Sequence, residues 1–226
     1  MKKLFVIALS VLLAAGTVYA DKKEAKEIAK ERKEIAKLSK AELNEKASKA
    51  ARKEAKRLKK EGWQVTPGAL PLDKQLDKSY QMQFEYDSNA YPKYLFGEAM
   101  SIGENYDGAK MQALELAKQN LAGQIQTEVT ALVENTVANQ QLQAEEAATI
   151  TESILASKNL ISQSIGRVIP VIEAYRVKSG TKNKEVLVRI AYNSDMAKAA
   201  AKKAIREDLE KKGQNLHNQL DKVLGF

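Results

Sequence analysis

The chain has 226 residues, a formal net charge of +8 and no cysteine, which excludes disulfides and thiolate metal sites. It is long enough for one or two compact units stabilised by packing alone. The basic excess is uneven, because residues 21–61 hold 16 Lys and Arg against 9 Asp and Glu, whereas residues 62–226 hold 19 against 20. The excess therefore belongs to one N-terminal segment.

Residues 1–20 have the pattern of a secretory signal peptide. Lys2 and Lys3 precede an apolar run at 4–15, and a small-residue end predicts cleavage after Ala20. The run is shorter than the roughly 20 apolar residues of a membrane-spanning helix. The pattern predicts a bacterial protein exported to the periplasm or cell envelope, where nucleic acid is not an expected partner.

Residues 21–61 contain no Gly or Pro and are rich in Ala, Glu and Lys, which predicts one long charged helix, a basic helical arm. Its apolar stripe is thin and consists partly of alanine, so little apolar area is available to hold it against a core. On this interpretation, removal of 21–61 leaves residues 62–226 folded.

The end of this arm is the candidate binding site. It carries seven basic residues against one acid, Glu54, and the seven are Lys49, Arg52, Lys53, Lys56, Arg57, Lys59 and Lys60. Several stack at i, i+4 spacing, and each such like-charge pair costs ~0.2 to 0.5 kcal/mol unless an anion relieves it. Two interpretations are open: a solvated face that keeps the chain soluble, or a surface that binds anionic lipid, anionic cell-wall polymer or another envelope protein.

Residues 62–93 form a predicted connector. A Pro-Gly turn at 67–68 is followed by Pro71, which suits the start of a helix, and apolar residues then recur every four positions from Leu72 to Phe84. This spacing predicts a short amphipathic helix over 71–87. Seven of the eleven aromatic residues beyond position 20 lie between 80 and 106, either as core or as a sugar-stacking platform: Tyr80, Phe84, Tyr86, Tyr91, Tyr94, Phe96 and Tyr106.

Residues 94–213 carry the pattern of an α+β core domain. The expected elements are a strand at 94–103, a helix from Asp107, a helix at 141–160, a β-hairpin around Gly180 and a helix from 194. The first helix repeats alanine at 109, 113 and 117, which lets a helix approach a sheet closely. The expected fold is a small antiparallel sheet with helices packed on one face, followed by an amphipathic tail at 214–226.

Catalytic signals are weak. The single histidine, His217, lies in the predicted tail, and the glycines match neither a dinucleotide-binding nor a P-loop spacing. No catalytic residue, metal site or cofactor is therefore predicted. Glu98, inside the first predicted strand, is the carboxylate whose pKa burial could raise. A glycosidase that uses Glu98 would need a second acid about 5 to 9.5 Å from it.

Three segments together carry a family resemblance: "YLFGEAMSIG", "YDGAKMQALELAKQNLAGQI" and "GRVIPVIEAYRVKSGTKNKEVLVRIAYN". Over about 94–193 the chain resembles the bacterial envelope domain of the Lpp-twenty lipoprotein family, whose relatives include outer-membrane lipoproteins and flagellar assembly proteins. The resemblance implies a noncatalytic α+β domain with a structural role. The chain departs from the lipoprotein members because it has no cysteine for lipidation.

The sequence thus predicts an exported, noncatalytic envelope protein with a structural, scaffolding or assembly role, attached peripherally through its basic arm. One alternative is a periplasmic carrier or holdase, in which the helices cover a pocket on the sheet for an apolar ligand or an unfolded client. A further alternative is a cell-wall glycan hydrolase that uses Glu98.

Overall fold

The computed structural model describes Lys26, Ala29, Lys30, Lys33 and residues 45–224, except Asn89, Gln140 and Gln141. The predicted signal peptide and most of 21–44 lie outside the described residues. Contacts between residues divide the chain into two units, 1–46 and 47–226. The four described residues between 26 and 33 are helical, and all elements named below belong to the second unit.

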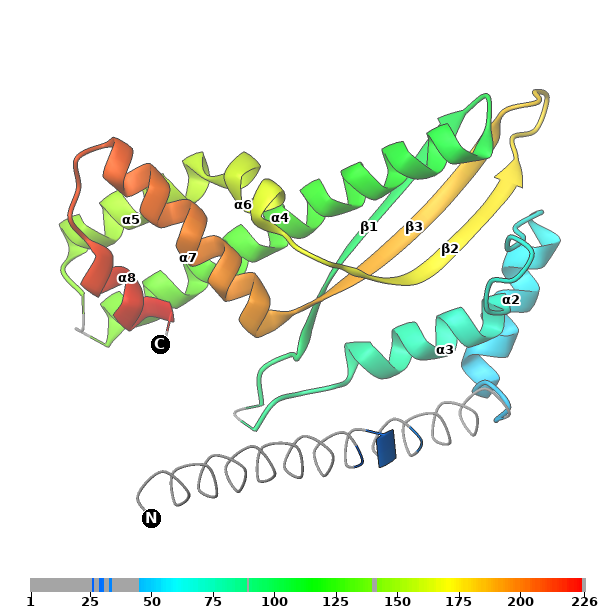
Figure 1. The fold of residues 1–226 in the computed structure, drawn as a ribbon, viewed down its shortest axis with the longest axis horizontal. Helices are drawn as coiled ribbons and strands as arrows, with labels where there is room; N and C mark the ends of the chain where they lie inside the picture. The colour runs from blue at the N-terminus through cyan, green and yellow to red at the C-terminus, as the bar shows by residue number, and fades with distance from the viewer. Residues whose placement is uncertain are drawn as a thin grey trace, which may run out of the picture. The chain divides into compact units, whose positions relative to one another are not determined.

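In the part of the chain that the structure describes, the second unit has seven helices and a three-stranded antiparallel sheet, so the predicted α+β class is confirmed (Figure 1). The strand order is β1-β3-β2. In chain order the elements are α2 (Lys49–Lys60), α3 (Leu72–Gln83), β1 (Tyr94–Gly103), α4 (Tyr106–Ala138), α5 (Ala144–Ala156), α6 (Lys158–Ser164), β2 (Ile169–Val177), β3 (Lys184–Asn193), α7 (Ser194–Lys211) and α8 (His217–Leu224).

Helix α4 crosses one face of the sheet at very short range. Its alanines Ala109, Ala113 and Ala117 are completely buried against β1 and β3. A Cβ atom added to Gly97 of β1 would lie 2.1 Å from the carbonyl oxygen of Ala117. The alanine repeat therefore exists because the backbone of α4 touches the backbone of β1, and any larger side chain at the crossing would separate them.

Beyond the sheet, the second half of α4 forms a helical end with α5, α6, α7 and α8 (Figure 1). The helix expected at 141–160 is two helices that meet at Ser157. The expected tail is α8, whose side chains Leu220, Val223 and Leu224 are buried in the same core as α4. Its apolar spacing is therefore that of a core helix.

Helices also cover the second face of the sheet, so the expectation of helices on one face only is corrected. Helix α3 packs on β2, and α2 packs on α3. A second hydrophobic core, separate from that of α4, lies between this face of the sheet and helices α2 and α3. Both Val171 and Ile172 are buried in it, because a register irregularity between Pro170 and Ile172 changes which side chains of β2 share a face. The sheet therefore presents apolar side chains on both faces, and each face needs a helical layer.

The single helix expected over 21–61 is wrong at 45–48, which is not helical. Ser48 caps α2, because its hydroxyl accepts a hydrogen bond from the backbone N–H of Ala51, and its own N–H donates to Asp77 of α3 at 3.0 Å. Ala47, Ala51 and Ala55 are buried with Trp63, Leu72 and Leu76 in the second core. The boundary between units consequently falls after Lys46, and α2 belongs to the folded unit.

Candidate functional site

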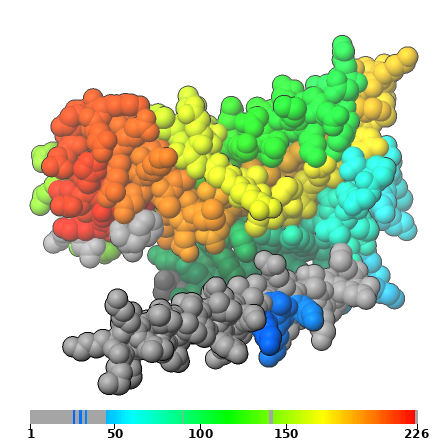
Figure 2. Space-filling model, viewed as in Figure 1, coloured from blue at the N-terminus to red at the C-terminus, as the bar shows by residue number. Residues whose placement is uncertain are grey.

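Helix α2 is held along one side and exposed along the other. Ala51 and Ala55 face the second core, and the N–H of Trp63 donates to the carbonyl of Leu58 at 3.0 Å, which folds the chain back under the helix. The guanidinium of Arg176 lies 4.6 Å from the centre of the Trp63 ring. Helix α2 lies at the surface, at the right-hand edge of Figure 2.

The seven basic residues predicted from the sequence are all exposed on α2. Arg57 differs from the other six, because its guanidinium contacts Glu54 at 2.5 Å and Glu61 at 2.6 Å. The hydrogen bond from Arg57 lowers the pKa of the Glu54 carboxyl. Within the described residues the six others, Lys49, Arg52, Lys53, Lys56, Lys59 and Lys60, have no ion-pair partner. The spacing of Glu54, Arg57 and Glu61 in the sequence already permits this pairing.

Four of the six unpaired residues line a shallow groove of about 400 Å³ between α2 and the start of α3. They are Arg52, Lys56, Lys59 and Lys60, and Ala55 and Asp73 complete the lining. The sequence does not predict that Asp73 lines this groove, because Asp73 belongs to another helix, α3. The groove can bind an anionic group electrostatically, through the guanidinium of Arg52 and the ammonium groups of the three lysines.

The aromatic cluster between 80 and 106 is partly core and partly surface. Tyr80, Tyr94, Phe96 and Tyr106 are half-buried, whereas Phe84, Tyr86 and Tyr91 are exposed. The exposed three lie in one loop, in which the N–H of Asp87 donates to the carbonyl of Tyr91 and the N–H of Lys93 donates to that of Glu85. The core interpretation is therefore confirmed for the four half-buried residues, which pack against the cores, and the sugar-stacking interpretation stays a prediction for the three exposed ones.

Glu98 lies on the α3 side of the sheet, where it is exposed and paired with a cation. Its carboxylate contacts the guanidinium of Arg189 at 2.5 Å, and Arg189 also donates to the hydroxyl of Ser79 at 2.9 Å. The partner of Glu98 is therefore a positive charge on the neighbouring strand. This geometry differs from the paired carboxylates that glycoside hydrolysis requires.

A second acidic group, Glu173 on β2, joins the start of α4 to the sheet. Its carboxylate accepts hydrogen bonds from the Tyr106 hydroxyl and from Lys110 Nζ, the latter at 2.9 Å. Burial raises the pKa of the Tyr106 phenol, and the bond to Glu173 raises it further. Tyr106 therefore stays protonated as a hydrogen-bond donor, and the cluster acts as a structural link.

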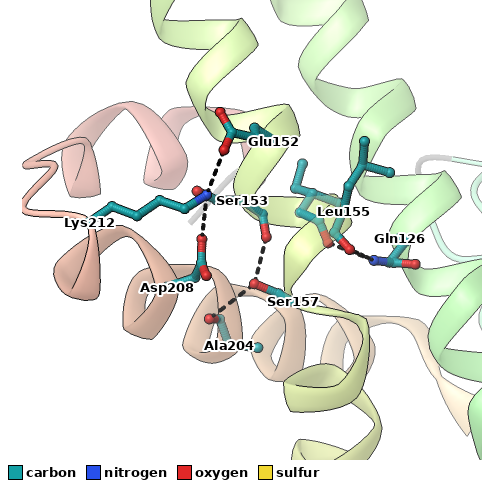
Figure 3. Close-up of polar contacts among 9 residues, drawn as sticks. Gln126, Glu152, Ser153, Leu155, Ser157, Ala204, Asp208 and Lys212 are labelled. Atoms are coloured by element: carbon teal, nitrogen blue, oxygen red, sulfur yellow. Dashed lines mark hydrogen bonds and ion pairs between the residues drawn. The ribbon is translucent and has the colours of Figure 1, made fainter.

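The serines Ser153 and Ser157 lie near Lys212 and Asp208, as Figure 3 shows, but their contacts do not form a nucleophile and base. Both serines are completely buried, and the Ser157 hydroxyl donates to the carbonyl of Ser153 at 2.6 Å. Hydrogen bonds to Asp208 and Glu152 raise the pKa of Lys212. A protonated lysine cannot take a proton from a serine, so the cluster ties α5 to α7.

Nothing in the described part of the chain indicates a metal site or a membrane span. No group of three or more His, Cys, Asp or Glu side chains is placed there to hold a metal ion. No described helix is both long and apolar enough to cross a bilayer. His217 lies on α8, with its Nε2 3.7 Å from a carboxylate oxygen of Glu210.

No family model, curated protein or solved structure matches the chain. The description of the site therefore depends on its geometry alone.

Proposed function

We propose that the chain is an exported, noncatalytic protein of the bacterial envelope with a structural or scaffolding role. It attaches peripherally to an anionic surface, lipid or cell-wall polymer, through the exposed face of α2. The observation that carries this proposal is the set of six basic side chains without ion-pair partners in the described chain, on a helix fixed to the folded unit.

Electrostatics favour this role for α2. Each basic residue near an anionic membrane surface contributes ~1 kcal/mol, screened over a Debye length of about 8 Å at physiological salt. The like-charge pairs along the helix repel each other in the free protein, and an anionic surface reduces that repulsion. Because α2 is already folded and docked on α3, binding does not have to order it.

The envelope location has separate support in the sequence. The basic start, apolar run and small-residue end of residues 1–20 fit an export signal. The resemblance over 94–193 to the Lpp-twenty family agrees with an envelope role, and it supports assembly more than catalysis. A basic helix offers a noncovalent attachment in place of a lipid on cysteine.

Fractionation of bacterial cells that express the full chain tests location and attachment together. We expect a product shortened by residues 1–20 in the envelope fraction, released by a high-salt wash because the attachment is electrostatic. A variant with K56E, K59E and K60E should appear in the soluble periplasmic fraction without a salt wash. Recovery of the uncleaved chain in the cytoplasm would contradict the proposal.

The carrier alternative receives less support from the structure. The pocket enclosed between the start of β1, α4 and α7 is lined in part by Tyr91, Leu95, Leu132 and Ala197, and its volume is about 50 Å³. Ligand pockets usually have at least ~300 Å³. The hydrolase alternative loses its motivation, because Glu98 is exposed and bound to Arg189.

A further inference from the structure

A second open groove lies at the helical end of the unit, between the last turns of α4 and the outer face of α5. Its volume is about 660 Å³, and its floor is apolar: Val133, Val137, Ala144, Ala147 and Ala148 line it. Leu155 at its margin is 65% exposed. Ala144, Ala148 and Leu155 are all exposed, so the apolar strip between the two helices is open to solvent.

The rim of this groove is acidic. Residues 119–157 contain five glutamates and no lysine or arginine. Glu134 and Glu152 line the groove, and Glu145 lies on the first turn of α5. Glu152 is paired with Lys212, whereas Glu134 and Glu145 have no ion-pair partner in the described part of the chain. The groove therefore suits an occupant that brings positive charge.

The chain itself carries such a surface at its other end. Helix α2 and the α4–α5 groove lie at opposite ends of the folded unit (Figure 1). Because α2 is fixed by its own core, it cannot reach the groove of its own copy. A contact between the two surfaces has to join two molecules, head to tail.

We propose that the exposed face of α2 docks in the α4–α5 groove of a second copy of this chain. Lysine stems can lie across the alanine and valine floor while their ammonium groups reach the glutamates. The lengths also agree, because α2 has 12 residues and α5 has 13, or about 18 and 20 Å of helix. The inference rests on the proposed role of α2 as an anion-binding face, and it identifies one anionic partner of that face as the acidic α4–α5 groove of a second copy.

The contact is heterologous, so it leaves one free α2 and one free groove on every pair. Such contacts build rings if the rotation closes and open chains if it does not. In an open chain, the one free α2 face at the end can still attach to an anionic surface.

Sedimentation velocity of the purified chain tests this contact. At low salt we expect species larger than a monomer that grow with protein concentration, and at high salt a monomer. The α2 variant K56E/K60E and the groove variant E134K/E145K should each weaken assembly at least tenfold. The variant with all four changes should assemble again, because the charges are complementary once more. K178E/K182E, on the β2–β3 turn, changes the net charge as much as K56E/K60E, so it is the charge-matched control and should assemble like the original chain.

The outcomes separate this inference from the proposed function. E134K/E145K should still bind anionic vesicles, whereas K56E/K60E should lose both vesicle binding and assembly. If the original chain is monomeric at low salt, or if E134K/E145K assembles unchanged, the head-to-tail contact is wrong. A fourfold variant that stays monomeric while folded would overturn it as well. Vesicle binding that depends on α2 would leave the proposed function standing in each of these cases.

Discussion

Substitution of Gly97 by alanine should lower the free energy of unfolding by about 3 kcal/mol, at the upper end of the cost of overpacking a core. The added Cβ would lie 2.1 Å from the carbonyl oxygen of Ala117 and 2.9 Å from Cβ of Leu121. The first contact is with backbone, which cannot rotate away, so α4 and β1 must separate. Urea unfolding of the purified chain measures the effect.

Gly123→Ala is the matched control for this substitution. Gly123 lies inside α4, and its added Cβ would meet only the flexible end of Lys158, at 3.7 Å. Because glycine is unfavourable in a helix, alanine there should stabilise the chain by about 0.5 to 1 kcal/mol. Equal stability of G97A and the original chain would mean that α4 does not cross β1 at this position.

Two N-terminal truncations should differ sharply. Removal of residues 1–46 leaves every element of the second unit in place, so we expect a cooperatively folded protein. Removal of residues 1–61 also takes away α2 and uncovers Trp63, Leu72 and Leu76. Full burial of one large apolar side chain contributes about 1.5 to 3 kcal/mol, so we expect a loss of about 3 kcal/mol or more.

The single tryptophan reports this difference directly. Trp63 is 5% exposed in the intact unit. Its fluorescence should therefore be that of a buried indole in the shorter truncation and of a solvent-exposed one in the longer. Identical emission and identical urea midpoints for the two truncations would show that α2 is a detachable arm after all.

Much of the fold could be predicted because its apolar pattern is local. The period-two alternation on either side of Gly180 predicted the β2–β3 hairpin, and the alanine repeat of α4 predicted a close helix–sheet approach. The place of closest approach could not be predicted, since it depends on the glycine at 97, in another element. The docking of α2 on α3 could not be predicted, because α2 packs through Ala47, Ala51 and Ala55, and alanines carry little apolar signal.

The candidate site was partly visible in the same way. Charge and spacing located the basic face of α2, because helical residues four apart share a side. They did not distinguish Arg57 from the six unpaired residues. Arg57 forms ion pairs with Glu54 and Glu61, which the sequence spacing allows but does not require. The Asp73 carboxylate in the groove required the tertiary structure, since α3 begins after a separate loop.

The measurement that tests the central claim most directly is cosedimentation of the purified chain with anionic lipid vesicles across a salt series. We expect binding at low salt that decreases steadily as salt rises. K56E/K59E/K60E should bind at least tenfold more weakly, since each cation contributes ~1 kcal/mol and 1.4 kcal/mol is a factor of ten. E54Q/R57Q, which removes one partner of each sign, should bind within about twofold of the original chain, because the net charge of the face does not change. Equal pelleting of the original chain and the triple variant, or binding that does not change with salt, would contradict the account.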